Sequence, residues 1–558
     1  MNKKTINIIL LILLFIVLLL SILIVIIGYN KEIVNIENYK KIENNQEKSV
    51  ITKIYLEDDN TRIDGEGVTQ RDNNIIIGKE GIYEISGTLT KGQIIIQTLV
   101  TSDVELRLAG VNITSIKNSP INCRCAKSLT ITLVQNTENF LTDTANYVYE
   151  DTADEEPNAT LFSKANLNIR GEGSLFVNSK FMHGISSKDN LVIESGNLDI
   201  NSIGDGIRGT DSVLIIDGKF NIKCGGDGIR SSSIQKSNLG YIVLENGEYN
   251  IEASCDGIQA ETNLNIYDGK YNIKTQGNPF GEADSQKGIK ANELIEIKKG
   301  NFVLNTIDDA IHSNNDLKIH YADMEIHTSD DAIHSEGKLI INDGNIEIKE
   351  AFEGIEGLEI SIFGGNININ TRDDGISAVG NGKPSIEMFG GYVNVFAHDD
   401  GIDINDNGDM YFRGGTLILD VSENMKYGPM AGSIDFPGTF YMLGGTMFGI
   451  GNNSNVQFPG KDSKYPTLVY YLDDDYNKEI KITIEDENGN ELFSYSGLMG
   501  KRYIEFSSEK LEIGKKYKII TDDGKEREVV LTELNNLFYD DFFKEEIDIW
   551  IKSGLIVK

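Results

Sequence analysis

Basic residues, cysteine, proline and tryptophan are scarce in this chain of 558 residues. It has 52 Lys and Arg against 86 Asp and Glu, a formal charge of −34, with 4 cysteines, 8 prolines and 1 tryptophan. The charge argues against nucleic acid as a partner, because phosphate recognition begins with clustered basic side chains. Four cysteines cannot form a disulfide framework, and their spacing excludes a zinc site. The acidic excess favours a partner that is cationic or is reached through a cation.

One long apolar run lies near the N-terminus. Residues 8–27 are apolar apart from Ser21, and about twenty helical residues span a bilayer core. The run lacks the small-residue cleavage site of a signal peptide, and Lys3 and Lys4 before it favour a cytoplasmic N-terminus. The sequence therefore predicts a single-pass protein of the cell membrane, with a cytoplasmic tip at 1–5, an uncleaved signal anchor at 6–28, a stalk at 29–50 and an extracellular remainder.

A short phrase recurs through the middle of the chain. It consists of an acidic residue or its substitute, then Gly or Ala, then Ile, as in Asp205-Gly206-Ile207, and ten copies occur between residues 183 and 402. Between the copies, apolar and polar residues alternate around a glycine, which predicts short strands and tight turns. Three strands and three turns in about 22 residues make one coil of a parallel β-helix. Stacked coils would bury the inward face that a lone coil exposes.

The same alternation indicates which side chains point inward. Phe220 lies between the polar residues Lys219 and Asn221, so it is expected to point into the core rather than toward a sugar ligand. Equivalent core positions are expected for Tyr249, Tyr271 and Phe302.

The repeat bounds the domains. We expect an all-β chain in which the parallel β-helix spans 51–455. From about residue 467 the period is lost, and turn sequences at 486–490 and 521–525 predict a small antiparallel β module at 466–535. A helical tail is expected at 536–558. Insertions at 146–158, 276–286 and 422–430 are expected to wall a groove.

Carboxylates recur at the corner of each predicted coil. Stacking places equivalent carboxylates within about 5 Å, where two like charges repel by about 3.3 kcal/mol. Calcium binds six to eight oxygens and would turn this repulsion into shared coordination. The alternative is turn chemistry, in which an Asp before Gly bonds the backbone two residues on. It explains one Asp of a doublet and leaves the second unexplained. The predicted calcium ligands are the doublets Asp308, Asp309, Asp330, Asp331, Asp373, Asp374, Asp399 and Asp400 and the single residues Asp205, Asp227 and Asp256.

A second column lies two residues after each small residue and is mostly basic. Positive groups beside bound calcium are what a polyuronate needs, because its carboxylates would otherwise be repelled. The alternative, that this column pairs with the neighbouring aspartates, stays open. The predicted carbohydrate-binding residues are Arg208, Arg230, Lys287, Lys290, His312 and His334.

Several phrases together resemble a known family. The repeated corner, with segments 81–88, 108–113 and 167–175, is similar to the clostridial extracellular carbohydrate-binding β-helix family, which is related in fold to pectate lyases. The resemblance covers roughly residues 50 to 450. It implies a right-handed parallel β-helix, bound Ca²⁺, and binding of plant cell-wall polysaccharide such as polygalacturonate or cellulose.

Three functions follow from these patterns. The first is a cell-surface protein that binds acidic or plant cell-wall polysaccharide with calcium. The second is a calcium-dependent, pectate-type polysaccharide lyase acting by β-elimination, with Lys290 or Lys287 as the base. The third is a structural cell-wall protein. Binding is favoured over catalysis, because no single lysine stands out within an acidic cluster as a catalytic base should.

Overall fold

The structure is a computed structural model that describes residues 51–149, 155–234, 238–277, 285–421, 432–451, 456–472, 479–497, 503–540 and 543–553. The described residues from Thr52 onward belong to one compact unit. The predicted anchor at 6–28 and the stalk lie outside the described residues, as do parts of the three predicted groove walls. Within the described part of the chain, no helix is both long enough and apolar enough to cross a membrane.

The first strands make the transition into the repeat. β1 (Ile51–Glu57) pairs antiparallel with β2 (Arg62–Asp64), after a single 3₁₀ turn, and β3 (Val68–Arg71) pairs antiparallel with β4 (Asn74–Ile77). From β4 onward the pairing becomes parallel, because β4 pairs with β6 (Gln93–Gln97) and β5 (Gly81–Leu89) pairs with β7 (Asp103–Thr114). The parallel stack thus begins within the first 30 residues of the described chain.

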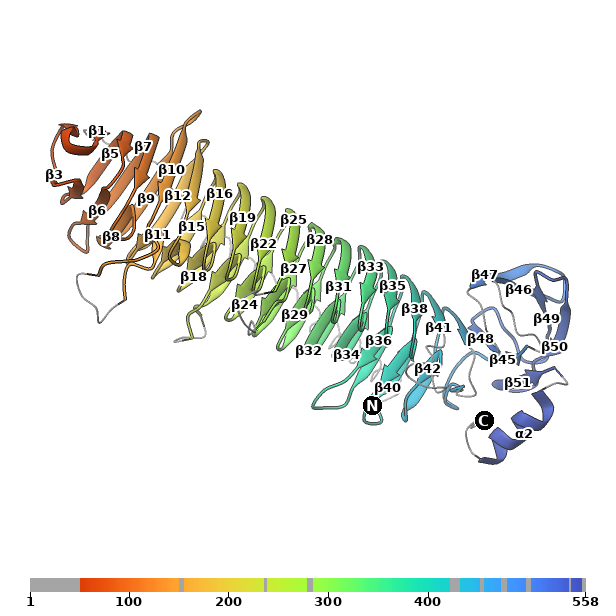
Figure 1. Cartoon of the computed structure of the whole chain (residues 1–558). Coiled ribbons are helices and arrows are strands. Elements are labelled where there is room, and N and C mark those ends of the chain that lie inside the picture. The colour runs from red at the N-terminus through yellow and green to blue at the C-terminus, as the bar shows by residue number, and fades with distance from the viewer. Residues whose placement is uncertain are drawn as a thin grey trace, which may run out of the picture. The chain divides into compact units, whose positions relative to one another are not determined.

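From β8 to β44 most coils contribute three strands, and each strand pairs in parallel with its counterpart in the next coil. Successive coils lie side by side in chain order (Figure 1). In the repeated corner, Ile207 pairs with Ile229, and Ile229 pairs with Ile258. The same register continues coil by coil to Ile434. The recurring isoleucines therefore form one column, and the pairing is that of a β-helix.

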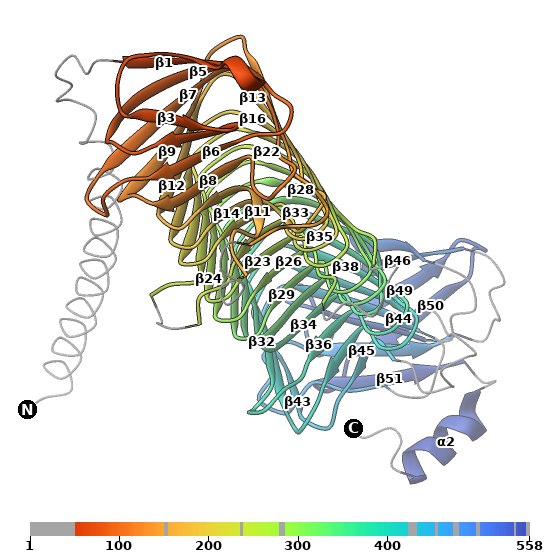
Figure 2. The same cartoon turned by 60° about the vertical axis from the view of Figure 1, so that its left-hand side comes forward.

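The strands form three faces, of which the first carries the isoleucine column (Figure 2). The first face contains β8 (Ile121–Cys125), β11 (Ala159–Ser163), β14 (His183–Ser187), β17 (Ile207–Gly209), β20 (Ile229–Ser231), β23 (Ile258–Ala260), β26 (Ile289–Ala291), β29 (Ile311–Ser313), β36 (Ile376–Ala378), β39 (Ile402–Ile404) and β42 (Ile434–Asp435). The second face contains β9 (Ser128–Leu133), β12 (Asn166–Gly171), β15 (Asn190–Ile193), β18 (Ser212–Ile215), β21 (Tyr241–Leu244), β24 (Asn263–Ile266), β27 (Leu294–Ile297), β30 (Asp316–Ile319), β37 (Ser385–Met388), β40 (Asp409–Phe412) and β43 (Thr439–Met442). Two long strands run through both faces, β32 (Ile333–Ile341) and β34 (Ile355–Ile362).

The third face contains β10 (Glu138–Thr142), β13 (Ser174–Asn178), β16 (Asn197–Ser202), β19 (Lys219–Cys224), β22 (Glu248–Ala253), β25 (Lys270–Thr275), β28 (Asn301–Thr306), β31 (Asp323–Thr328), β33 (Asn345–Ala351), β35 (Asn366–Thr371), β38 (Tyr392–Ala397), β41 (Thr416–Val421) and β44 (Thr446–Gly451). Its inward residues are buried and its outward residues are mostly exposed or half-buried. This alternation follows from the two-residue period of a strand.

Close packing explains the small residue of the repeated phrase. A Cβ added at Gly206 would lie 2.5 Å from Ile222 Cγ2 and 2.7 Å from the carbonyl oxygen of Gly228 in the next coil. Even the methyl group of alanine at Gly206 would therefore require the adjacent coil to shift.

Stacked aromatic rings fill part of the interior. Phe220, Tyr249, Tyr271 and Phe302 are buried, and successive ring centroids lie 4.9, 4.7 and 4.7 Å apart. The hydroxyl of Tyr249 donates to the backbone oxygen of Asn246, and that of Tyr271 donates to Asp268. The expectation that this column belongs to the core is confirmed.

The C-terminal residues cover the last coil. β48 (Tyr503–Ser508) pairs antiparallel with β44 and with β45 (Thr467–Tyr471), and β51 (Asn535–Tyr539) pairs in parallel with β45. β48 thereby covers a strand edge that would otherwise present unpaired backbone groups. A separate antiparallel sheet contains β46 (Ile480–Asp486), β47 (Glu491–Gly497), β49 (Lys516–Thr521) and β50 (Glu526–Val530). The region expected to be one module therefore contributes to two sheets. The region expected to be a helical tail begins with β51, and α2 covers Lys544–Ser553.

Candidate functional site

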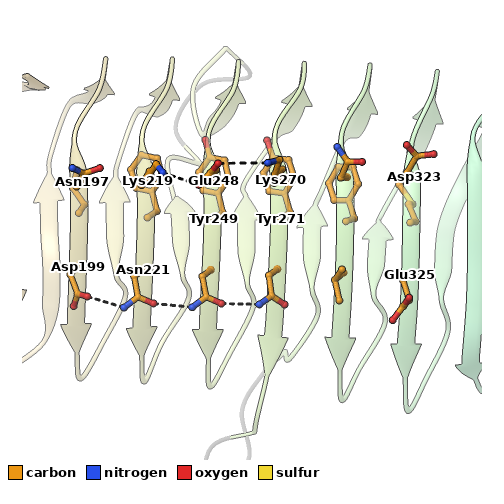
Figure 3. A pocket seen from close by; sticks show the side chains of 18 of the residues that line it. Asn197, Asp199, Lys219, Asn221, Glu248, Tyr249, Lys270, Tyr271, Asp323 and Glu325 are labelled. Carbon is orange, nitrogen blue, oxygen red and sulfur yellow. Dashed lines mark hydrogen bonds and ion pairs between the residues drawn. The ribbon is translucent and has the colours of Figure 1, made fainter. Parts of the chain in front are cut away.

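A trough of 910 Å³ runs across the strands of the third face. Its walls are two rows of outward side chains, two residues apart on each strand, and its floor is the strand residue between them (Figure 3). One wall contains Asn197, Lys219, Glu248, Lys270, Asn301 and Asp323, and the other contains Asp199, Asn221, Asn250, Asn272, Val303 and Glu325. Ser174 and Phe176 of β13 and Asn345 and Glu347 of β33 continue the lining, so the trough spans eight coils from β13 to β33.

Amide groups form a ladder along one wall. Asn221 Nδ2 donates to Asp199 Oδ2 at 2.8 Å, Asn250 donates to Asn221 Oδ1 at 2.9 Å, and Asn272 donates to Asn250 Oδ1 at 2.9 Å (Figure 3). An asparagine amide has two N–H donors and an oxygen with two lone pairs. The ladder uses one donor and one acceptor position of Asn221 and of Asn250. The remaining positions repeat at the spacing of the coils.

Charged side chains alternate along the opposite wall. Lys219 Nζ lies 3.3 Å from one oxygen of Glu248, and Lys270 Nζ lies 3.7 Å from the other. All three side chains are at least half exposed, at 69%, 53% and 72%. Such exposed ion pairs contribute little to stability, so these groups are free to exchange their partners for a ligand.

The sequence analysis did not identify this trough. It used Lys219 and Asn221 only to show that Phe220 points inward. The available signal was an outward asparagine at the same strand position in three successive coils, Asn221, Asn250 and Asn272. Sequence alone could not show that the wall opposite these amides would leave a continuous hollow.

The aspartates at the repeated corner connect successive coils. Asp205 Oδ1 accepts from the backbone N–H of Asp227 at 3.1 Å, and Asp227 Oδ1 accepts from that of Asp256 at 2.9 Å. Asp256 Oδ1 accepts in turn from Lys287 N at 2.7 Å. Each bond reaches the next coil, whereas the turn-chemistry alternative placed it two residues on. These side chains are therefore inter-coil acceptors, and they are buried.

The predicted basic residues face this column. Arg208 NH1 lies 3.3 Å from Asp205 Oδ2, and Arg230 NH1 lies 3.0 Å from Asp227 Oδ2. Burial raises the pKa of Asp227, and the neighbouring Asp205 and Asp256 raise it further. The Arg230 guanidinium opposes this rise. Both arginines thus already have carboxylate partners, as the pairing alternative proposed.

Lys287 and Lys290 are also engaged within the column. Lys287 Nζ lies 2.6 Å from Asp308 Oδ1 and 2.7 Å from Asp309 Oδ2. Lys290 Nζ donates to Ser285 Oγ at 3.1 Å and lies 3.9 Å from Asp256 Oδ2. Burial acts to lower the pKa of Lys287, but Asp309 and Asp308 outweigh it and raise the pKa. A protonated Lys287 is unsuited to the role of base.

The two predicted histidines lie at the same corner, one coil apart. His312 Nδ1 is 2.6 Å from Asp309 Oδ2, and His334 Nδ1 is 3.4 Å from the same oxygen. Burial acts to raise the pKa of Asp309. Hydrogen bonds from His312 and His334 and the ammonium of Lys287 outweigh burial and hold that pKa well below its ordinary value.

The balance of charge changes beyond His334. The equivalent positions in later coils carry Glu356, Ser377, Asp403 and Asp435. Burial, with the nearby Glu356 and Asp331, raises the pKa of Glu353 to about 9. Burial and the nearby Asp403 raise the pKa of Asp374 to about 7. Burial and the nearby Asp374 raise the pKa of Asp400 to about 9. This part of the column therefore concentrates carboxyl groups that resist ionisation in one another's presence.

One group of these carboxylates has the composition of a calcium site. Ligand oxygens of Asp373, Asp374 and Asp399 all lie within 4.8 Å of one another. Burial raises the pKa of Asp373 and that of Asp399. The negative charge of Asp399 raises the pKa of Asp373 further. Hard oxygen donors are what Ca²⁺ requires. Asp308, Asp309 and Asp330 form a similar group, but there the ammonium of Lys287 already lies against two of the three.

Stacked coils and a trough across eight of them define the class of this molecule. It is a repetitive all-β protein that presents a long polar surface in the direction of stacking. Such a surface suits an extended polymer better than a compact small molecule.

Comparisons with known proteins identify the family. The family described as "Carbohydrate-binding domain-containing protein" matches residues 71–332 and 328–527, and the chain belongs to it. A protein of that description from Acetivibrio thermocellus is 36% identical over 252 residues, covering 45% of this chain and 85% of the relative. A solved structure described as the polysaccharide lyase-like protein from C. thermocellum, gadolinium derivative, is 31% identical. It covers 44% of this chain and 97% of that chain, with a TM-score of 0.41.

Proposed function

We propose that this chain is a cell-surface protein that binds an extended plant cell-wall polysaccharide in the trough of the third face, with calcium bound at the acidic corner of the later coils. The observation that carries the proposal is the trough itself. One wall carries a hydrogen-bonding side chain in each of its eight coils, and the other wall does so except at Phe176 and Val303. Family membership supplies the ligand class.

The trough can recognise a polymer of hydroxyl groups. Asparagine amides donate and accept at once, which matches sugar hydroxyls that do the same. A ligand that lies along the direction of stacking meets an equivalent set of groups in each coil, so affinity accumulates over several sugar units. The exposed ammonium groups of Lys219 and Lys270 extend this to acidic sugars such as polygalacturonate. A cellulose-like polymer would use the amide wall.

The proposed calcium site is formed by Asp373, Asp374 and Asp399. These residues would supply three of the six to eight oxygens that Ca²⁺ takes, with water or a sugar carboxylate as the others. Bound calcium would offset the repulsion within the group and would provide a second point of attachment for an acidic polymer.

The cell-surface location is proposed from the apolar run at residues 8–27, which is long enough to anchor the chain in a bilayer.

Binding measurements on paired variants test the trough. Affinity electrophoresis of the full chain in gels containing polygalacturonate or a soluble cellulose derivative, each with Ca²⁺ or with a chelator, gives the dissociation constants. We expect the double variant Asn250→Ala, Asn272→Ala to bind about tenfold more weakly, the equivalent of about 1.4 kcal/mol.

The matched control removes an asparagine pair outside the trough. Asn190 Nδ2 donates to Asn166 Oδ1 at 2.9 Å on the second face, so the variant Asn166→Ala, Asn190→Ala loses the same chemistry elsewhere. It should bind like the original chain. Equal retardation of the two double variants would show that the polymer does not lie in the trough.

A further inference from the structure

A mixed nitrogen and oxygen site lies where the column beside the repeated corner changes from basic to acidic. The earlier coils carry Arg208, Arg230 and Lys290 at this position, and the next two carry His312 and His334. The coil after His334 carries Glu356, which pairs with it in register. His334 therefore lies between Glu356 and Asp309, and Asp309 already has the ammonium of Lys287 against it.

The two ring nitrogens of His334 have different surroundings. Nδ1 lies 3.4 Å from Asp309 Oδ2 and 3.6 Å from Asp331 Oδ2. Nε2 lies 3.5 Å from Glu356 Oε1 and 3.9 Å from the exposed Glu336. An imidazole that donates from one nitrogen to a carboxylate keeps a lone pair on the other. This is the arrangement by which a carboxylate orients a metal-ligating histidine.

Three donors converge at this point. Ligand atoms of Asp331, His334 and Glu356 all lie within 4.8 Å of one another. Bonds of 2.0–2.1 Å in a tetrahedral site place donor atoms about 3.3 Å apart, close to the 3.5 Å between His334 Nε2 and Glu356 Oε1. Asp331 is 8% exposed, and its Oδ1 accepts from the backbone N–H of Glu353 at 3.2 Å. That bond fixes the Asp331 carboxylate, whose Oδ2 lies 3.6 Å from His334 Nδ1 and would turn toward the Nε2 side to bind the same ion as Glu356.

The neighbouring group of Asp309, His312 and His334 is a poorer site. Lys287 Nζ lies 2.7 Å from Asp309 Oδ2, and His312 Nδ1 lies 2.6 Å from the same oxygen. A metal ion on that oxygen would have to displace an ammonium group and remain beside it. Asp309 is therefore better placed to orient His334 than to bind metal itself.

We propose that Asp331, His334 and Glu356 bind a divalent transition-metal ion of the zinc class, with Asp309 as the residue that orients His334. An imidazole donor favours Zn²⁺ and its neighbours in the first transition row over Ca²⁺, which prefers oxygen alone. The site has three protein ligands, which leaves at least one position for water or a sugar oxygen. The proposal does not depend on the trough or on the calcium site.

Metal titration of the full, tag-free chain tests the site. After chelator treatment, calorimetric titration with Zn²⁺ gives the stoichiometry and affinity, and the d–d absorption of Co²⁺ reports a nitrogen-containing, four- or five-coordinate site. We expect one Zn²⁺ with a dissociation constant in the micromolar range or below. His334→Gln and Glu356→Gln should each weaken Zn²⁺ binding at least tenfold and remove the Co²⁺ band. Asp309→Asn should weaken it by about 10 to 100-fold, as loss of an orienting carboxylate does.

Two controls separate this site from other metal binding. His327 has a side chain 43% exposed beside Glu325, and His327→Gln should leave Zn²⁺ binding unchanged. The double variant Asp373→Asn, Asp399→Asn should also leave it unchanged. The proposal is overturned if the original chain binds no Zn²⁺, if millimolar Ca²⁺ displaces the ion as readily as Zn²⁺ does, or if Zn²⁺ affinity persists in both folded variants, His334→Gln and Glu356→Gln.

Discussion

The side-chain Oδ1 of Asp227 accepts a hydrogen bond at 2.9 Å from the backbone N–H of Asp256, its counterpart in the next coil. The same atom-to-atom relationship joins Asp205 to Asp227, Asp309 to Asp331 and Asp374 to Asp400. The repeated phrase therefore needs an aspartate because its side chain accepts a hydrogen bond from a buried backbone N–H of the next coil.

Removing one of these acceptors should destabilise the stack. Asp227→Ala leaves the N–H of Asp256 and the guanidinium of Arg230 without this partner, and an unsatisfied buried group costs about 1 to 3 kcal/mol, more when charged. We expect a loss of about 2 to 4 kcal/mol in the free energy of unfolding, measured from denaturant midpoints. Asp217 is exposed at a turn, so Asp217→Ala should cost less than about 1 kcal/mol. An equally small effect of Asp227→Ala would contradict the structural role.

Calcium should stabilise the folded chain through the later coils. A ligand at a hundred times its dissociation constant adds about 2.7 kcal/mol, so Ca²⁺ in place of a chelator should raise the melting temperature by several degrees. Asp373→Asn with Asp399→Asn should abolish the rise. Asp343 is an exposed turn residue outside the group, and Asp343→Asn should retain it. A rise that persists in the double variant would place the ion elsewhere.

The lyase alternative predicts unsaturated reaction products, whereas a binding protein forms none. A raised pKa keeps Lys287 protonated at neutral pH, so it cannot take the proton that β-elimination requires. Incubation with polygalacturonate and Ca²⁺ should produce no increase in the absorbance of unsaturated products. If absorbance increases with the original chain but not with Lys290→Ala, the function of the chain is catalysis rather than binding.

The joint between the last coil and β48 should weaken at alkaline pH. Glu505 is fully buried and accepts from Ser433 Oγ at 2.9 Å through Oε2. Among the residues that the structure describes, its Oε1 has no hydrogen-bond partner. Burial raises its pKa to about 8. The folded chain therefore binds a proton that the unfolded chain releases above its ordinary pKa near 4.5.

The sign of the pH effect follows from this difference. The contribution of Glu505 is complete below about pH 4.5 and is lost as pH rises through about 8, on the order of 5 kcal/mol in total. Glu505→Gln should therefore make the melting temperature less dependent on pH between 5 and 9. The exposed substitution Glu545→Gln should leave the original slope. A slope unchanged in Glu505→Gln would assign the pH dependence to other carboxyls.

Local pattern predicted much of the architecture. A two-residue alternation and a 22-residue repeat were sufficient for the strands, for the isoleucine column and for the buried stack from Phe220 to Phe302. The pairing of β44 with β48 was not predictable, because it joins Gly451 to Tyr503 across 51 intervening residues without a repeat. Strand pairing at that separation depends on how the intervening chain folds.

The sequence by itself determined the coil, its period and the register of its aspartates, because these depend on residues close together or one repeat apart. Only the tertiary structure decided which aspartates already have a cation, since Lys287 reaches from its own coil to Asp308 and Asp309 in the next. It also decided that the outward asparagines flank a trough, because the space between two rows of side chains depends on every coil that forms the walls. Some of the excess acidic side chains, such as Asp308 and Asp309, therefore have a lysine against them. Others, such as Asp373, Asp374 and Asp399, form a group that favours a bound cation.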